Sequence, residues 1–258
     1  MNYVRVVVLC VCAVACASPA AAATTVLRFG KLVDGHGNIL TDAVVVIEND
    51  RITAVGPAST ATPPDAQVTD LRPLTAIPGL IDLHTHMTYF WDEAPGTLPF
   101  GQPARATAIT VFLAQANARR TLESGATTVR DLGAQDYADI AMRDLINQGA
   151  MVGPRMFVAG YGLSITRGVP RPGTTPGGRA DGRDEVIRVA RAQLGAGADW
   201  VKMFGSTGSY QDVTGFQTFT LDEMKAAVEV TTHQLGKPDP ARGRLRPFRR
   251  HRSASRIS

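Results

Sequence analysis

The sequence predicts an α/β protein: a small β domain, then a partial (β/α)8 TIM barrel consisting of its first four βα units. From residue 76 to residue 238, apolar strands alternate with helical segments, as in parallel βαβ units. Each unit opens on a short apolar run, near residues 76, 126, 155 and 199. A closed barrel of eight units typically needs about 250 residues. This stretch of 163 residues therefore accommodates half of one.

Residues 1–23 have the pattern of a secretory signal peptide. Arg5 supplies the positive charge, residues 6–17 the apolar core and residues 20–23 a small-residue cleavage site. The apolar run is too short to span a bilayer, and a buried strand would not explain the alanines. A lipoprotein site at Cys16 lacks the usual leucine. We expect an exported protein, periplasmic or secreted, without a membrane anchor. All three cysteines lie in this segment, so the mature chain would have no disulfide.

Residues 24–75 are expected to form the small β domain. Short β-rich runs between residues 25 and 55 are separated by turn signals at residues 35–38 and 48–50. His36 falls in the first of these turns and is expected to be solvated. A last short strand is expected near residues 68–71, after a segment rich in Pro, Ala and Thr.

The half-barrel's strands are expected at residues 76–83, 126–131, 155–159 and 199–204, and its helices at residues 104–123, 136–148, 183–194 and 220–235. Asp181 is expected to cap the third helix, and Thr220 with Glu223 makes a capping box for the fourth. The loop of residues 160–182 is dense in Gly, Pro, Arg and Thr. A loop of this length in a compact domain is more often functional than accidental.

The composition changes abruptly after Pro238. Residues 241–258 contain seven arginines and no acidic residue, so the net charge of +4 and the pI of about 9.2 come from this tail. No apolar run of strand length follows residue 238. We expect residues 239–258 to be disordered and foreign to the fold, as a shifted reading frame of GC-rich DNA would encode. The chain would then be a truncated fragment.

Two histidines one residue apart end the first barrel strand, in IPGLIDLHTH. Alternate strand residues share a face, so Asp82, His84 and His86 line up. Neutral imidazole is a good ligand for zinc and similar divalent ions. One pair does not complete a site that needs three or four ligands. An ordinary polar strand exit is the alternative interpretation.

Lys202 lies inside the apolar run DWVKMF, where a buried ammonium without a partner is costly. At the carboxyl end of a barrel strand, a polar side chain indicates an active-site residue. The alternative is a lysine that reaches the rim or pairs with Asp131 or Asp199. The strand alone does not separate these interpretations.

Four motifs together resemble the amidohydrolase superfamily, and within it the imidazolonepropionase-like and Xaa-Pro dipeptidase-like members. They are GKLVDG at residues 30–35, IPGLIDLHTH at 77–86, GATTVRDLG at 125–133 and GADWVKMFGSTGS at 197–209. The resemblance runs from about residue 26 to residue 238. It implies a metal-dependent hydrolase that cleaves amide C–N bonds of small amides or dipeptides with a metal-activated hydroxide.

The resemblance also implies roles for individual residues. His84 and His86 would hold one metal ion, and Lys202, carboxylated by CO2, would bridge two. The ions would be divalent, and two Zn2+ in the complete parent enzyme. A carbamate presents two anionic oxygens, whereas an ammonium repels cations. Such a pair of ions, roughly 3.5–4 Å apart, can activate water and polarise the scissile carbonyl.

Three further residues of that pattern have no counterpart in this sequence: histidines of the fifth and sixth strands and an aspartate of the eighth. No catalytic residue is therefore assigned, and the 258-residue chain is expected to be inactive. His233 and His251 are interpreted as solvated. Arg167 and Arg171 are weak candidates for binding a substrate carboxylate, which arginine's fork suits.

Two other functional classes remain open. One is a non-catalytic half-domain that binds metal. The other is a nucleic-acid-binding protein that uses the arginines of residues 242–256. The remainder of the chain is acidic and the protein is expected to be exported, so no nucleic-acid partner is expected.

Overall fold

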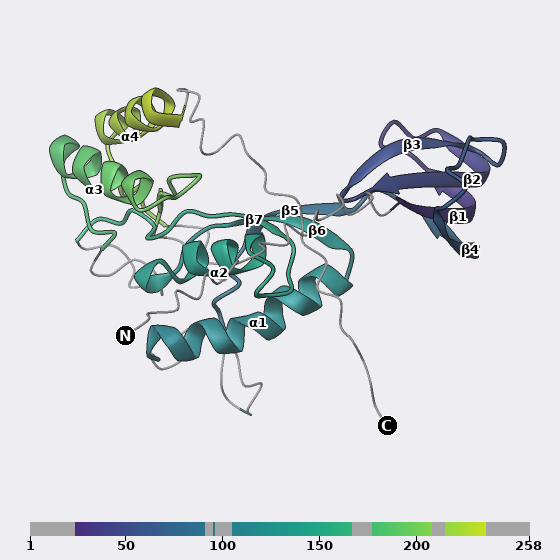
Figure 1. Cartoon of the computed structure of the whole chain (residues 1–258). Helices are drawn as coiled ribbons and strands as arrows, with labels where there is room; N and C mark the ends of the chain where they lie inside the picture. Colours follow the sequence, from purple (N-terminus) through teal and green to yellow (C-terminus); the bar gives the residue numbers. More distant parts are fainter. Residues whose placement is uncertain (1–23, 91–94, 96–104, 167–176, 208–214, 236–258) are drawn as a thin grey trace, which may run out of the picture. The chain divides into compact units, whose positions relative to one another are not determined.

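The computed structural model describes residues 24–90, 95, 105–166, 177–207 and 215–235 (Figure 1). The chain divides into two compact units, residues 1–77 and 78–258. The expected signal peptide, the arginine-rich tail, Arg167 and Arg171 lie outside the described residues. None of the helices in the described ranges is long and apolar enough to cross a membrane.

The first unit is a four-stranded sheet with the order β3-β2-β1-β4 (Figure 1). β1 and β2, and β2 and β3, are antiparallel, whereas β4 runs parallel to β1. The strands are β1 Thr24–Val33, β2 Ile39–Glu48, β3 Arg51–Pro57 and β4 Gln67–Ala76. In the β1–β2 turn, the Asp34 carboxylate accepts the N–H groups of His36 and Asn38 at 2.8 and 2.9 Å. Asp commonly stabilises turns in this way. His36 is exposed, as expected.

β2 is the centre of this unit, and four successive residues, Ala43 to Val46, are buried in it. Successive strand residues point to opposite faces. Val44 and Val46 accordingly pack with Val26, while Ala43 and Val45 pack with Leu32. The run AVVV therefore reflects a strand covered on both faces.

In its described residues, the second unit contains a parallel sheet with the order β5-β6-β7 and four α-helices. Its strands are β5 Leu80–Thr85, β6 Ala126–Asp131 and β7 Arg155–Phe157. Its helices are α1 Thr107–Glu123, the 3-10 helix η1 Gln135–Tyr137, α2 Ala138–Asn147, α3 Arg183–Gly195 and α4 Leu221–Leu235. The order confirms the predicted alternation of parallel strands and helices.

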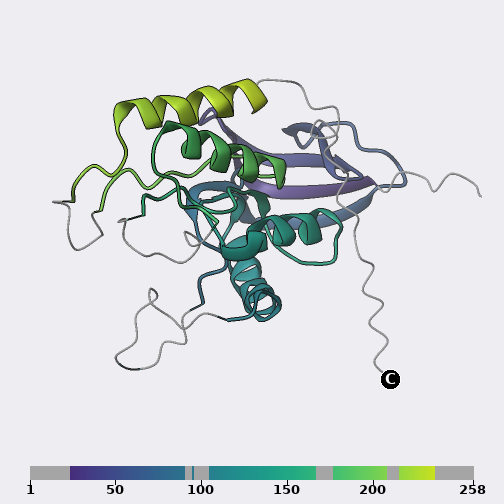
Figure 2. The ribbon, with the colours of Figure 1, turned by 90° about the vertical axis from the view of Figure 1, so that its left-hand side faces the viewer.

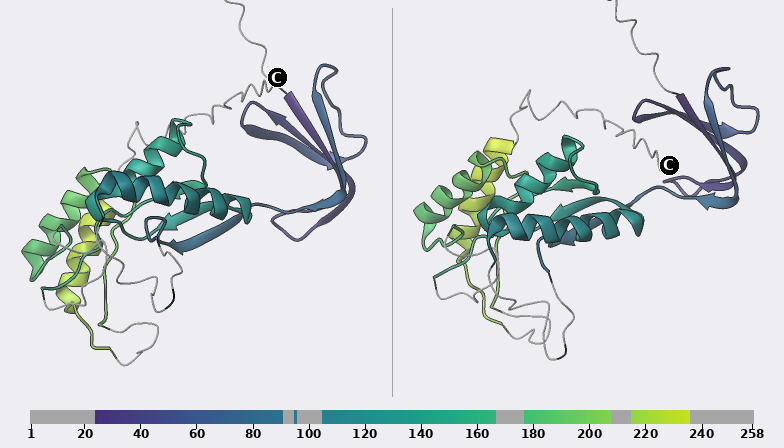
Figure 3. Two further views of the ribbon diagram at one scale, coloured as in Figure 1. Left: turned by 90° about the horizontal axis from the view of Figure 1, so that it is seen from below. Right: turned by 60° about the horizontal axis from the view of Figure 1, so that its bottom comes forward.

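Two apolar clusters hold this unit together. Val129 of β6 and Met156 of β7 pack against α1 and α2, which lie along the sheet in Figure 3. α3 and α4 lie side by side (Figure 2) and pack through Val186, Val189 and Ala226. Because Val129 faces the helices, Arg130 of the same strand points to the opposite face of the sheet.

Several expected boundaries are wrong. β4 spans Gln67–Ala76 and not only residues 68–71, and α2 spans Ala138–Asn147 and not residues 136–148. β5 begins at Leu80, because Ala76 ends β4 of the first unit and Pro78-Gly79 separates the two strands. α1 begins at Thr107, not at residue 104. β7 ends at Phe157, not at residue 159, because two carboxylates, and not a neighbouring strand, accept the next backbone N–H groups. Asp199 binds that of Val158, and Asp139 binds that of Ala159.

The expected strand at residues 199–204 is not a strand in the structure. A single bridge joins Met203 to Leu163, with short hydrogen bonds on either side. Asp181 does not cap α3: Gly182 occupies that position, and the Asp181 carboxylate accepts the N–H of Thr166 at 2.9 Å. The capping box of α4 is confirmed, since the Glu223 carboxylate accepts the N–H of Thr220 at 2.7 Å.

Candidate metal centre

His84 and His86 stand together at the carboxyl end of β5. Their ring centroids are 5.5 Å apart, and the rings meet edge to face at 61°. Local sequence produces this arrangement, because residues two apart on an extended backbone share a face. Asp82, expected on the same face, uses its carboxylate to accept the N–H of His84 at 3.0 Å.

The contacts of His86 select one ring tautomer. Its Nδ1 lies 3.3 Å from the carbonyl oxygen of Gly133, and its ring stacks on Tyr89 with centroids 4.3 Å apart. A carbonyl oxygen only accepts, so this contact needs a proton on Nδ1. Nε2 is then the nitrogen with the lone pair. Histidines that ligate metals commonly donate their other ring N–H to a carbonyl in this way.

The surroundings of His84 favour its neutral form. Desolvation lowers the pKa of His84, and the positive charges of Lys202 and Arg130 lower it further, while Asp82 opposes them. Neutral imidazole is the form that binds metal ions. The two cations that favour the neutral ring would also repel a metal ion, so the charge on Lys202 matters for this site.

Lys202 comes from a part of the chain distant in sequence and acts on His84 through its charge. Its backbone carbonyl accepts the N–H of Leu163 at 2.7 Å, and its Nζ lies 5.1 Å from the centre of the Phe204 ring. Gly162 makes room for it: a Cβ there would lie 2.5 Å from the Phe204 ring and 3.2 Å from Cγ of Lys202. The fold thus brings Lys202 close enough to affect the pKa of His84.

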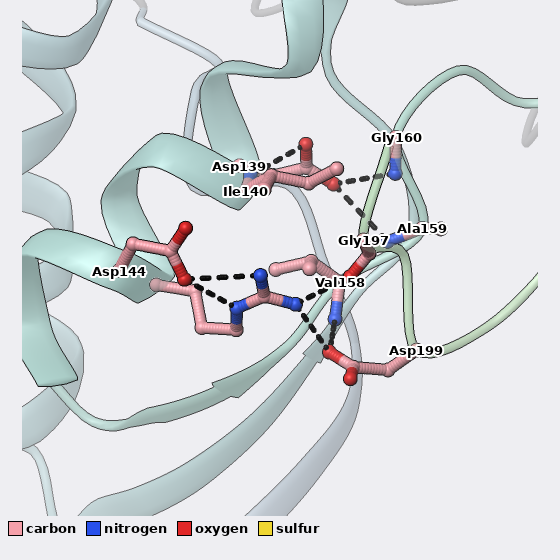
Figure 4. A network of polar contacts seen from close by, with 9 residues as sticks. Asp139, Ile140, Asp144, Val158, Ala159, Gly160, Gly197 and Asp199 are labelled. Carbon is pink, nitrogen blue, oxygen red and sulfur yellow. Dashed lines mark hydrogen bonds and ion pairs between the residues drawn. The ribbon is translucent and has the colours of Figure 1, made fainter. Parts of the chain in front are cut away.

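Two carboxylates hold the segment that follows β7 (Figure 4). Asp139 of α2 accepts the N–H groups of Ala159 and Gly160 at 3.1 and 2.8 Å. Asp199 accepts the N–H of Val158 at 3.0 Å and pairs with Arg143 at 3.1 Å. Asp199, expected as a possible partner of Lys202, thus contacts Val158 and Arg143.

Sequence reasoning missed Asp139, although a signal was present. Asp139, Met142 and Ile146 follow one another at helical spacing, and all three are buried. An acid on the apolar stripe of a helix predicts a buried carboxylate, and such groups usually have hydrogen-bond partners. Desolvation raises the pKa of Asp139, and the backbone N–H groups that it accepts oppose that effect.

The side chains of this site fit one part of a metal centre. Two imidazoles on one face are suitable as two of the three or four ligands of a zinc-type site. Lys202 becomes a donor only without its positive charge. In the ranges that the structure describes, no group of three or more His, Cys, Asp or Glu side chains could hold a metal ion.

Comparison with known proteins supports the predicted resemblance. Residues 75–238 match the model of the amidohydrolase family. Ochratoxinase of Aspergillus niger is 32% identical over 253 residues, which cover 84% of this chain and 50% of that protein. Imidazolonepropionase of Micrococcus luteus is 40% identical over 62 residues, covering 24% of this chain and 15% of that protein.

The similarity extends to solved structures. A Xaa-Pro dipeptidase with bound methionine in its active site matches with a TM-score of 0.69 and 28% identity, over 83% of this chain and 55% of that one. The structure of A. niger ochratoxinase matches with a TM-score of 0.65 over 83% of this chain and 54% of that one. The chain thus spans about half the length of these relatives, and its homologues are hydrolases. With more than half of its residues matching the family model, the chain belongs to the amidohydrolase family.

Proposed function

We propose that this chain contributes the N-terminal half-barrel of a metal-dependent hydrolase that cleaves an amide C–N bond in a small, dipeptide-like substrate. The observation that carries the proposal is the position of His84 beside His86, with Lys202 close enough to act on His84. The structural match to a Xaa-Pro dipeptidase supports the substrate class.

His84 and His86 would bind one divalent ion through neutral rings. When bound, the metal supplies Lewis acidity toward water and the substrate carbonyl. The Lys202 ammonium would first lose one proton. The neutral amine would then form an N–C bond to CO2 and release a second proton, which leaves a carbamate. That reaction replaces a positive charge beside His84 with a negative one and adds two oxygen donors. The site would then attract a cation.

The described residues provide neither the remaining ligands nor an acid placed to transfer the proton. We therefore assign no catalytic residue and propose that the 258-residue chain hydrolyses dipeptides weakly or not at all. Arg167 and Arg171 stay proposals for substrate binding. Export directed by residues 1–23 also stays a proposal, and N-terminal sequencing of the protein from a periplasmic or culture fraction tests it.

Calorimetric titration with Zn2+ tests the metal site. Wild-type chain should bind about one ion through the histidine pair, and His84→Ala or His86→Ala should abolish measurable binding, because one imidazole does not make a site. His36→Ala is the matched control, since His36 is an exposed turn histidine of the first unit. Equal binding by all four proteins would contradict the proposal.

Carbon-13 NMR with labelled bicarbonate tests the role of Lys202. A carbamate signal should appear in the wild-type chain with Zn2+ and should be absent from Lys202→Met. The chain should then be assayed for release of proline from Xaa-Pro dipeptides. Metal binding without turnover would favour the second candidate, a non-catalytic metal-binding half-domain. The incomplete set of donors in the described ranges supports that candidate.

A further inference from the structure

The turn that follows β5, residues 85–89, carries His86 and is fixed from several sides. We call it the histidine turn. Within it, the Tyr89 N–H donates to the His86 carbonyl at 3.0 Å. At its start, the Thr85 carbonyl accepts the N–H of Leu132 at 2.9 Å. The position of the His86 ring therefore depends on what holds this backbone.

Asp131, the last residue of β6, is the first group that holds the turn. Its Oδ2 accepts the N–H of Met87 at 2.5 Å and lies 3.4 Å from the Thr85 hydroxyl. Asp131 is completely buried, and Oδ1 has no hydrogen-bond partner among the described residues. Burial and the charge of Asp139 raise the pKa of Asp131 to about 8, against the Met87 N–H. Burying a carboxylate is costly. The buried Asp131 carboxylate contacts the turn that carries His86.

Asn117 of α1 is the second group. Its Nδ2 donates to the carbonyl oxygens of Met87 and Tyr89, at 2.9 and 2.8 Å. An amide nitrogen carries two hydrogens, so both are used here. Asp131 accepts the N–H of Met87 while Asn117 donates to its carbonyl oxygen. The peptide groups on both sides of Met87 are thus held, and the Met87 side chain is buried in the core.

We propose that Asp131 and Asn117 are positioning residues of the metal centre, which hold the histidine turn so that the His86 ring stands beside His84. The inference rests on the proposed function. Neither residue would touch the metal ion. Both act through the backbone, which sets the ring of His86 against Gly133 and Tyr89. Groups that orient ligands in this way typically change metal affinity by about 10–100-fold when they are removed.

The test is the Zn2+ dissociation constant of the full 258-residue chain and its variants. Asn117→Ala removes both hydrogen bonds while alanine suits the helix, so binding should weaken about tenfold. Gln115→Ala is the matched control, because Gln115 is an exposed amide on the same helix, and binding should not change. Asp131→Asn keeps an acceptor for the Met87 N–H and should stay within about threefold of wild type, whereas Asp131→Leu should weaken binding as Asn117→Ala does.

A second measurement on the metal-free chain separates this inference from the proposed function. Amide hydrogen exchange at Met87 should be faster in Asn117→Ala than in wild type, while the amides of β1 and β2 keep their protection. If wild type binds no Zn2+, the proposed function fails, and exchange at Met87 still shows whether Asn117 holds the turn. Unchanged exchange and unchanged Zn2+ affinity in Asn117→Ala would overturn the inference, even if Asp131→Leu did not fold.

Discussion

β2 and β5 are both apolar strands, yet only β2 is buried. In β2, the residues from Ala43 to Val46 are at most 6% exposed, and the strand lies between β1 and β3. In β5, Leu80, Ile81 and Leu83 are 55, 64 and 57% exposed, and among the described strands β5 pairs only with β6. Strand composition predicts that a segment is extended and suited to burial. Only its neighbours decide whether it is buried.

The two strands also differ in whether they carry candidate site residues. β2 is fixed by packing on both faces and carries no candidate site residue. β5 is exposed and carries His84, with His86 just beyond it. An apolar strand at the edge of a sheet is also open to pairing with another chain. The strand with the candidate ligands is therefore the one most sensitive to what lies beside it.

An aspartate placed in each strand should reveal the largest difference in stability between β2 and β5. Val44→Asp would bury an unpaired carboxylate in β2 and should destabilise the chain by about 4 kcal/mol or more. Ile81→Asp in β5 should change stability by less than about 0.5 kcal/mol, because Ile81 is exposed. Urea unfolding of the full chain measures both. Similar losses in the two variants would mean that β5 is covered in solution.

Asp131 in the second unit and Asp70 in the first should make contributions to the free energy of unfolding that change with pH in opposite directions. The pKa of Asp131 is raised from 3.8 to about 8, so the folded chain holds more protons than the unfolded chain between these values. The free energy of unfolding should fall as pH rises through this window, by up to about 1.4 kcal/mol per pH unit. This loss of stability should be complete above about pH 8 and absent below pH 3.8.

Asp131→Asn should remove this contribution. The measurement is urea unfolding of the metal-free chain, with chelator, from pH 4 to pH 9. Asp139, whose pKa burial also raises, should leave a residual slope of the same sign in the variant. A slope that does not differ between wild type and variant would show that Asp131 is ionised in the folded chain.

Adding a methyl group beside Lys202 should have a smaller effect on stability. Gly162→Ala would place a Cβ 2.5 Å from the Phe204 ring and should cost about 1–3 kcal/mol. Gly195→Ala at the end of α3 meets no atom within 4 Å and should stabilise the chain by about 0.5 kcal/mol. Thermal unfolding compares them. If Gly162→Ala leaves the unfolding temperature unchanged, the segment around Lys202 moves easily.

The smallest effect concerns an exposed ion pair of the first unit. Arg72 donates to Asp70 at 2.6 Å, and this hydrogen bonding lowers the pKa of Asp70 to about 2. A lowered pKa stabilises the fold above 3.8, and that contribution is lost as pH falls toward 2. Arg72→Ala should move the pKa of Asp70 back toward 3.8 in an NMR titration, with almost no change in stability, because both groups are exposed.

Local patterns in the sequence were sufficient for several elements. β6 has the predicted bounds, residues 126–131, because TTV suits a strand and Gly125 separates it from α1. The capping box of Thr220 and Glu223 forms because its hydrogen bonds span only three residues. That His84 and His86 share a face follows from strand periodicity. The prediction of a strand at residues 199–204 was wrong. A strand needs a neighbouring strand of matching length, and this segment has a single bridge, from Met203 to Leu163.

The sequence by itself determined the alternation of strands and helices and the family of the chain, because these depend on neighbours in sequence or on short motifs. His84, His86 and Lys202 stay the proposed metal ligands that the resemblance to that family implies. Tertiary structure alone decided what surrounds them. It placed Lys202 near His84 and brought Asp131 and Asn117 to opposite sides of Met87. These contacts join residues thirty or more positions apart. Their formation depends on how strands and helices pack, which no local pattern encodes.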